Sequence, residues 1–474
     1  MIKYNKMLLL VVVLFWQQSA FAQQKWSLKQ CVDYAIENNI SIKQSYINTE
    51  VARTNADQNF ASMFPNVNAS ASQSFNFGRS IDPTTNVYIN SNINGASGAL
   101  NADVTLFNGF RLQNLLRQSK IDYSAAKYDV DKMKNDIAMN TVANYLTVLF
   151  GKENLKAAND RVAITQRQVN NVKVQVDAGS LAQGNLLDIE SQMATEEQSV
   201  VAAENTLRQA LLDLTQVMNL ADVAGFDIEA PIVDIPSQET LTVPTTAINQ
   251  TAIGIMPEIK ASDMRYQSAI KGVTIARGSY LPRLSAFGQL STNYSSISKE
   301  LDGAPIFTGY APNGNLTASG EVILSPEYAV NTKHTAFNDQ IKNNFNKAFG
   351  VSLSIPIFNG MSTKYSLERA RLQEQNAKYS VDLQKQILFK SIQQAQIDAL
   401  NASKRYEAAS KSVKALQTSF AYTEKRFNVG LINSLDYNTT KNNLTRAESE
   451  LLQSKYELIF RIKVLDFYMG KPLI

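Results

Sequence analysis

Cysteine and histidine are nearly absent from this sequence. Among its 474 residues are one Cys, Cys31, and one His, His334. A disulfide framework, a zinc site, or a Ser/His or Cys/His nucleophilic centre needs more of these residues than the chain contains. No phosphate-binding loop or other cofactor motif is present. We therefore expect no metal site, no cofactor and no enzymatic activity, and Cys31 is interpreted as a small core residue.

A strong excess of one charge is also absent. Lys and Arg number 46 against 42 Asp and Glu, which gives a formal net charge of +4 without a basic run. Nucleic acid is therefore not expected as a partner. Hydrophobic residues make up 44% and charged residues 19% of the chain, a composition typical of a folded protein.

The apolar run near the start of the chain, Met7 to Trp16, is too short to cross a bilayer. Lys3 and Lys6 precede it, and Ala20-Phe21-Ala22 follows it with the small residues of a cleavage site. This order predicts a secretory signal peptide over residues 1–22, with the mature chain beginning at Gln23.

One helical hairpin occurs twice in the sequence. Apolar residues recur every seven positions on both sides of Gly430, and subtracting 251 from each position gives the same pattern around Gly179. A sustained seven-residue repeat predicts helices that coil around each other. The repeated positions are Tyr406, Val413, Phe420 and Phe427 with Tyr437, Leu444, Leu451, Leu458 and Leu465, matching Leu155, Val162, Val169 and Val176 with Leu186, Met193, Val200, Leu207 and Leu214.

Between the helical segments the pattern changes to the two-residue alternation of strands. Leu100, Ala102, Val104 and Leu106 alternate with Asn101, Asp103 and Thr105, and similar alternation surrounds residues 67–77, 284–294 and 349–357. One apolar and one small polar face over about ten residues is typical of a transmembrane β-barrel strand. An edge of a soluble β-sandwich would alternate in the same way; aromatic residues at the strand ends favour the membrane interpretation.

Together these patterns predict a duplicated helix-strand-strand-helix unit that is mostly α with a transmembrane β part. The first repeat covers 23–220, with a helix at 27–64, strands at about 66–77 and 96–107, and helices at 110–177 and 185–219. A linker at 221–246 follows. The second repeat covers 247–474, with a helix at 247–281, strands at about 284–294 and 348–358, and helices at 361–428 and 435–468; its surface loop is 34 residues longer than that of the first.

Four strands cannot close a barrel, and open strand edges are not tolerated in lipid. The chain is therefore expected to oligomerise. The order of landmarks resembles the TolC-like outer-membrane efflux protein family over nearly all of the mature chain: Phe64-Pro65, Tyr280-Leu281-Pro282, two Phe-Asn-Gly motifs at 107–109 and 358–360, and Arg426-Phe427-Asn428-Val429-Gly430. The resemblance implies a homotrimer with a 12-stranded β-barrel that continues into a long coiled-coil α-helical barrel, with the linker in an equatorial collar.

The same resemblance suggests functional residues at the periplasmic tip. Asp436 matches an aspartate of an acidic pore constriction, while the corresponding first-copy residue is Asn185, with Asp188 nearly one turn later. Without the resemblance, Asp436 would be an ordinary acid stabilising a helix N-terminus. Gly179 and Gly430 are expected to form the tip turns near which adaptors dock. Phe427 and Ile432 occupy positions that in the family carry polar gate contacts, which these side chains cannot make.

The function that the resemblance implies is a passive export duct of a tripartite efflux or type I secretion system. It would lie in the cell outer membrane of a Gram-negative bacterium, extend into the periplasm, and contact outer-membrane lipid. Its partners would be a periplasmic adaptor (membrane fusion) protein and an inner-membrane pump of RND, ABC or MFS type. The alternative is a non-conducting scaffold or adhesin that spans the periplasm. The exported substrate is not predicted.

Overall fold

The computed structural model describes residues 25–81, 87–221, 225–230, 239–429, 431–432 and 434–472. The predicted signal peptide, residues 1–22, and Gly430 lie outside these ranges. The described chain divides into two units. One comprises the described parts of 1–54, 120–269 and 373–474, and the other those of 55–119 and 270–372. The first unit is helical, and the second contains the strands together with the adjoining helix ends.

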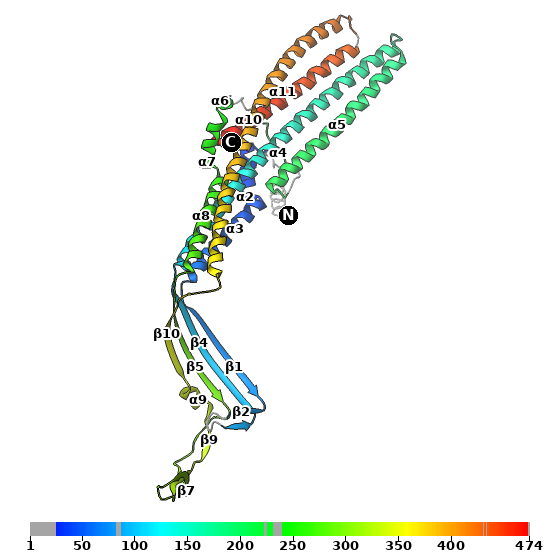
Figure 1. The fold of residues 1–474 in the computed structure, drawn as a ribbon. Helices are drawn as coiled ribbons and strands as arrows, with labels where there is room; N and C mark the ends of the chain where they lie inside the picture. The colour runs from blue at the N-terminus through cyan, green and yellow to red at the C-terminus, as the bar shows by residue number, and fades with distance from the viewer. Residues whose placement is uncertain are drawn as a thin grey trace, which may run out of the picture. The chain divides into compact units, whose positions relative to one another are not determined.

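Two long helical hairpins dominate the helical unit (Figure 1). Helix α4 (Arg111–Asp177) turns back into α5 (Gln183–Met218), and α10 (Ser362–Asn428) turns back into α11 (Ser434–Tyr468). Both α4 and α10 contain 67 residues, which corresponds to about 100 Å at 1.5 Å per residue. No helix in the described part of the chain is long and apolar enough to cross a membrane.

Each copy has its own hydrophobic core. The first surrounds Tyr145 and Leu149 of α4, which pack with Leu214 and the fully buried Cys31. The second surrounds Leu388 and Ile392 of α10, together with Leu458, Ile462 and Leu465 of α11. The prediction that Cys31 is a core residue is confirmed. Burial of this thiol raises its pKa to about 12, so Cys31 is protonated at neutral pH.

The predicted single helices at 27–64 and 247–281 are each two helices. In the first copy, α2 (Leu28–Asn38) and α3 (Ile40–Ala61) are separated at Asn39; in the second, α7 (Thr245–Ile255) and α8 (Pro257–Gly278) are separated at Met256. Asn39 leaves the helical conformation, and its side chain accepts from Ser41 N and donates to Val217 O. Met256 precedes Pro257, which disfavours helical geometry in the residue before it. The two breaks are 217 positions apart, so the duplication reproduces them.

The four long strands form one antiparallel sheet in the order β1-β4-β5-β10. Their bounds are Asn66–Asn76, Ile93–Asn108, Arg283–Ser295 and Asn346–Ser354. Strand β4 begins earlier than predicted. Strand β10 ends four residues before its predicted end, because Pro356 has no N–H to donate to a ladder.

The two strand hairpins have the same register. Val67 pairs with Ala102 in the first copy, and Leu284 pairs with Leu353 in the second. These pairs correspond through the same offsets, 217 for the first strand and 251 for the second. The duplication therefore extends to individual strand pairs.

The segments between paired strands contain further structure. Short strands β2 (Arg79–Ile81) and β3 (Tyr88–Asn90) pair in the first copy, and β6 (Lys299–Leu301) pairs with β9 (Thr332–His334) in the second. The longer second connection also contains a hairpin of β7 (Ile306–Leu316) and β8 (Val322–Ala329), and a short helix, α9 (Phe337–Asn343). In Figure 1, α9 lies beside the strands of the sheet.

The Phe-Asn-Gly motifs form the turns that connect strand to long helix. In the first copy, Gly109 and Phe110 both have positive φ angles, 67° and 61°. The Asn108 side chain accepts a hydrogen bond from Leu112 N at 3.3 Å, which satisfies one of the open N–H groups at the start of α4. A Cβ at position 109 would lie 2.3 Å from Gly278 O, so only glycine fits there. The second copy repeats the turn at Gly360 and Met361, with φ angles of 62° and 65°.

Candidate functional site: the hairpin tips and the exposed sheet

The first hairpin tip is a helix C-terminus closed by glycine. Gly179 has a φ of 70°, its N–H bonds to Val176 O at 2.9 Å, and Ser180 N bonds to Gln175 O at 2.9 Å. This pair of bonds is the Schellman arrangement, which requires a left-handed residue at the glycine position. Gly179 therefore forms the predicted chain reversal.

The second tip has the corresponding bond on the residue after the glycine. Leu431 N donates to Arg426 O at 2.9 Å, although Gly430 itself lies outside the described residues. Phe427 of α10 stacks on Tyr437 of α11, with ring centroids 4.7 Å apart and planes 27° apart. Ile432 is half-buried. Phe427, one of the two positions that carry polar gate contacts in the family, thus forms an aromatic contact between the two helices of the second tip.

The three candidate constriction residues are exposed near the beginnings of the two returning helices. Asn185 and Asp188 lie in the first two turns of α5, and Asp436 lies in the first turn of α11. Asp188 and Asp436 therefore belong to different hairpins. Within the described ranges of one chain, no group of three or more His, Cys, Asp or Glu side chains is arranged to hold a metal ion.

The sheet presents one apolar face over all four strands. Strand register places Leu100 opposite Leu290, Val104 opposite Ala286, and Val351 on the same face. Many of these side chains are exposed; Phe349 is 93% exposed and Val67 is 58% exposed. The opposite face carries small polar side chains, for example Ser72 and Ser97, whose hydroxyl oxygens lie 2.8 Å apart. Alternation of apolar and polar faces, predicted from the sequence, is present in the paired strands.

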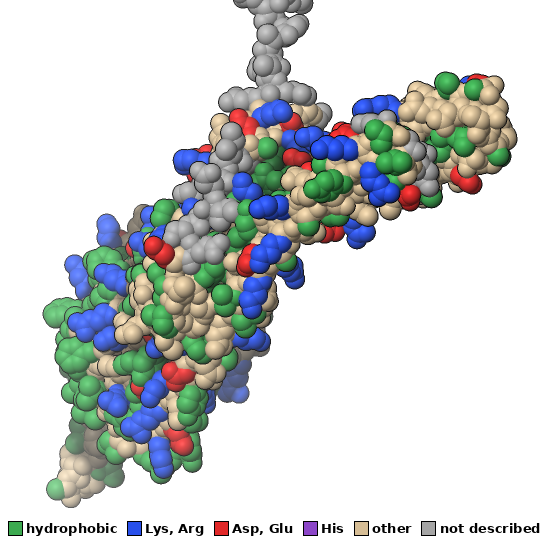
Figure 2. Space-filling model, turned by 90° about the horizontal axis from the view of Figure 1, so that it is seen from above, with side chains coloured by type: hydrophobic (Ala, Val, Ile, Leu, Met, Phe, Trp, Pro, Cys, Tyr) green, Lys and Arg blue, Asp and Glu red, His purple; other side chains and the backbone are tan. Residues whose placement is uncertain are grey.

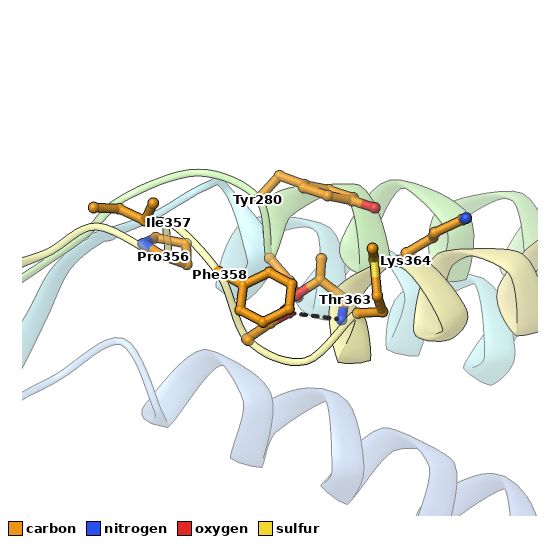
Figure 3. Close-up of a pocket in the computed structure, with 9 residues that line it drawn as sticks. Tyr280, Pro356, Ile357, Phe358, Thr363 and Lys364 are labelled. Atoms are coloured by element: carbon orange, nitrogen blue, oxygen red, sulfur yellow. Dashed lines mark hydrogen bonds between the residues drawn. The ribbon is translucent and has the colours of Figure 1, made fainter.

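At the junction of sheet and helices in the second copy lies a small open cavity (Figure 3). Tyr280, which follows α8, and Phe358 lie on different sides of it, while Thr363 and Lys364 come from the first turn of α10. Ile357 and Phe358 are 94% and 77% exposed. Aromatic and basic side chains at the end of an apolar sheet face are typical of a membrane interface.

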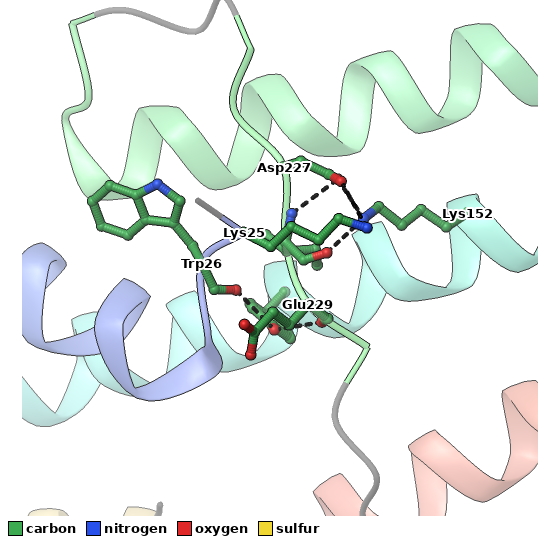
Figure 4. A network of polar contacts seen from close by, with 7 residues as sticks. Lys25, Trp26, Lys152, Asp227 and Glu229 are labelled. Atoms are coloured by element: carbon green, nitrogen blue, oxygen red, sulfur yellow. Dashed lines mark hydrogen bonds and ion pairs between the residues drawn. The ribbon is translucent and has the colours of Figure 1, made fainter. Parts of the chain in front are cut away.

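A polar network in the helical unit attaches the linker to α4 (Figure 4). Trp26 N donates to Asp227 O at 2.9 Å and Glu229 N to Trp26 O at 3.0 Å, while the buried Tyr145 hydroxyl donates to Glu229 O at 2.6 Å. Lys152 donates to Ile228 O at 2.6 Å and forms an ion pair with Asp227. Linker and N-terminal segment are thus held together on one long helix.

Charge compensation explains the ionisation of Asp227. Burial alone would raise the pKa of this carboxyl, but the hydrogen bond and positive charge of Lys152, the Ile228 N–H and the charge of Lys25 outweigh it and lower the pKa. Asp227 lies in the predicted linker. Its partner lies 75 positions away on α4, and no local pattern indicates such a contact.

Charged side chains form no concentrated patch on the face seen in Figure 2. On the face drawn in Figure 2, Lys and Arg side chains are scattered among hydrophobic and uncharged ones over the helices. Most described ion pairs are exposed contacts within one helix or between neighbouring helices, as for Lys411 and Glu407 at 2.7 Å. Such pairs contribute little stability.

An antiparallel sheet with one apolar face, two unpaired edge strands and two long helical hairpins defines the fold class of TolC-like outer-membrane channels. A family model described as outer membrane efflux protein matches residues 31–220 and 249–471. The chain belongs to this family. It is similar in structure to the Campylobacter jejuni CmeC outer membrane channel, with a TM-score of 0.74 and 18% identity over 94% of this chain and 85% of that one.

Two curated proteins are similar to this chain in sequence, each with 22% identity. An uncharacterized protein of Haemophilus influenzae is 22% identical over 290 residues, which cover 58% of this chain and 58% of the relative. This chain thus spans less than two thirds of that protein. Toxin and drug export protein A of Aggregatibacter actinomycetemcomitans is 22% identical over 377 residues, 77% of this chain and 70% of the relative.

Proposed function

We propose that three copies of this chain close a 12-stranded barrel in the outer membrane and form a passive export duct. The observation that carries the proposal is the pair of open edges on the sheet: among the described residues, β1 and β10 each have one neighbouring strand. An unpaired edge with exposed apolar side chains is costly in lipid. Pairing β10 of one copy with β1 of the next would remove every edge.

Exposed apolar residues on the helices support the same assembly. Tyr365, Leu372 and Tyr379 recur every seven positions along α10 and are 58%, 61% and 60% exposed. Their first-copy counterparts lie on α4 at 114, 121 and 128, where Asn114 is 6% exposed and Lys260 of α8 lies over the Tyr128 ring. Within the described part of one chain, the second-copy row is thus more exposed than the first-copy row. A neighbouring chain would cover this row.

The duplication predicts the register between copies. Strands β4 and β5 pair Ala102 with Gly288, and the offsets of 251 and 217 convert this pair into Leu353 and Ala71 of the neighbouring copy. Cross-strand Cβ atoms lie about 4.5–5.5 Å apart. A chain carrying Leu353→Cys and Ala71→Cys should therefore be cross-linked to a covalent trimer by a short thiol-specific reagent.

The matched control combines Leu353→Cys with Val67→Cys, which is four residues, or about 13 Å, out of register. The native Cys31 is buried and should not react. Equal cross-linking of both pairs, or of neither, would contradict the proposed closure. The alternative scaffold or adhesin predicts no selective trimer.

We infer further that the tips close the duct and that Asp436, with Asp188, lines its constriction. Crowded carboxylates favour cations, so the purified protein should form cation-selective pores in planar bilayers. Asp436→Ala should weaken that selectivity, and Asp188→Ala should weaken it to a smaller extent. Selectivity unchanged by both substitutions would place the constriction elsewhere; absence of pores would favour the scaffold.

In this proposal an inner-membrane pump of RND, ABC or MFS type supplies the energy and a periplasmic adaptor binds near the tips. Gly179 and Gly430 form the turns of the two tips, and Phe427 and Ile432 contribute packing at the second tip. The family membership supports an efflux role. The relative named for toxin and drug export supports export in general, without indicating which substrate this chain transports. Cleavage after residue 22 would release the mature chain for insertion.

A further inference from the structure

Helix α9 lies on the apolar face of the sheet. Thr292 donates its hydroxyl to Ile341 O at 2.8 Å, and the Tyr294 ring lies 5.1 Å from that of Phe337. Thr292 and Tyr294 alternate in register with Leu290, so they belong to the apolar face. The helix therefore covers part of the face that, under the proposed function, meets lipid.

Hydrogen bonds fix α9 to the end of the sheet remote from the long helices. The buried Gln340 side chain accepts from Ser295 N at 2.9 Å and donates to Ser295 O at 3.0 Å. Asn344 donates to Asn293 O at 2.7 Å. Strand β5 starts after α8 and ends at Ser295, so these contacts position α9 at the outer rim of the proposed barrel.

Between α9 and the sheet lies an open groove whose lining is largely apolar. Its floor includes the small residues Ala71, Ala96 and Gly98, and Phe337 and Ile341 form its wall. Ser72, Gln73, Ser97 and Thr292 add polar groups to the lining. A largely apolar groove continuous with a lipid-facing surface fits a hydrocarbon chain better than a polar ligand.

A basic side chain lies at the start of β10, level in register with Leu290 and so two to five residues inward of the α9 contacts at Thr292 and Ser295. Lys347 pairs in register with Leu290 and thus projects from the apolar face, and its Nζ lies 5.3 Å from the Phe345 ring. Lys342 follows the groove residue Ile341 on α9. Lysines and aromatic residues at the end of an apolar surface match a layer of phosphate headgroups above hydrocarbon.

We propose that this groove and the two lysines bind an anionic, phosphorylated lipid of the outer leaflet. One acyl chain lies against Ala71, Gly98, Phe337 and Ile341, and the lysines meet the phosphate. The proposal rests on the proposed function, because only a sheet in the outer membrane presents this face to lipid. The bound lipid would anchor α9, and with it the long second connection, to the membrane surface.

The test is native mass spectrometry of the detergent-purified assembly with equimolar diphosphoryl lipid A and phosphatidylcholine. The unaltered protein should retain lipid A preferentially. Lys347→Gln and Lys342→Gln should each weaken retention about fivefold. Gly98→Leu should weaken it by filling the groove; a Cβ at Gly98 meets nothing within 4 Å.

Lys299→Gln is the matched control, a lysine of the same connection in strand β6; it should leave retention unchanged. Equal retention by all variants, or equal retention of both lipids, would overturn the proposal, as would displacement of lipid A by millimolar inorganic phosphate, which would show a simple anion site. Bilayer conductance of the same preparations separates the two proposals. Variants that conduct and still retain lipid A refute only the lipid site, whereas an unaltered protein that neither trimerises nor conducts refutes both.

Discussion

Replacing Lys152 with Met should loosen the attachment of the linker to α4. The change removes the charge that pairs with Asp227 and the donor to Ile228 O at 2.6 Å, while it keeps an apolar side chain on the helix. A hydrogen bond to a charged group contributes about 1.5–3 kcal/mol. The Lys152 and Asp227 side chains are 26% and 32% exposed, so solvent screening reduces this value. We expect the local opening free energy to fall by about 1–2 kcal/mol.

Hydrogen exchange measures this opening directly. The Trp26 amide donates to Asp227 O at 2.9 Å, and the Glu229 amide donates to Trp26 O at 3.0 Å. A loss of about 1–2 kcal/mol should accelerate the exchange of these two amides about 5- to 30-fold. Lys156→Met, on the same helix and exposed, is the control. Unchanged exchange in Lys152→Met, or equal acceleration in the control, would refute the assignment of stability to this ion pair.

The ion pair of Lys152 and Asp227 also makes the stability of the fold depend on pH. The folded state lowers the pKa of Asp227, so its contribution is fully present above the unfolded value of about 3.9 and is lost as pH falls through the lower folded value. Thermal melting between pH 7 and 3 should show this loss in the unaltered protein. Asp227→Asn should have a smaller acid dependence; an identical pH profile would contradict the argument.

Four further substitutions test three local features. Gly179→Ala should destabilise the first tip by about 1–2 kcal/mol because its φ is 70°, whereas Gly184→Ala, within α5, should stabilise it by about 0.5–1 kcal/mol; exchange of the tip amides separates the two. Phe427→Leu should lose about 0.5–1.5 kcal/mol of ring stacking, measured as faster exchange in the last turn of α10. Asn108→Ala should cost about 0.5–2 kcal/mol by removing the contact to Leu112 N, read from thermal melting; an unchanged melting temperature would mean that water replaces it.

Helices and strands with a regular spacing of apolar residues were predictable from the sequence. Heptads and the turn glycine identified the hairpins, and the two-residue alternation identified the four long strands. The helix break at Asn39 was missed because its cause is a tertiary hydrogen bond to Val217 O; the break at Met256 could have been read from Pro257. The contact of Lys152 with Asp227 and the position of α9 depend on residues distant in the sequence, which periodicity does not report.

The duplication preserves the backbone more closely than the chemistry. Position 145 of α4 and its counterpart 396 of α10 both hold the linker, yet Tyr145 donates to Glu229 O at 2.6 Å while Gln396 donates to Val243 O at 2.9 Å. Arg161 and Glu196 form an ion pair at 3.0 Å, and their counterparts are Ser412 and Ala447, which cannot. Equivalent positions thus fulfil similar packing roles with different side chains. The same divergence separates Asn185 from Asp436, so an acidic ring in the proposed trimer would have threefold symmetry although its backbone approaches sixfold symmetry.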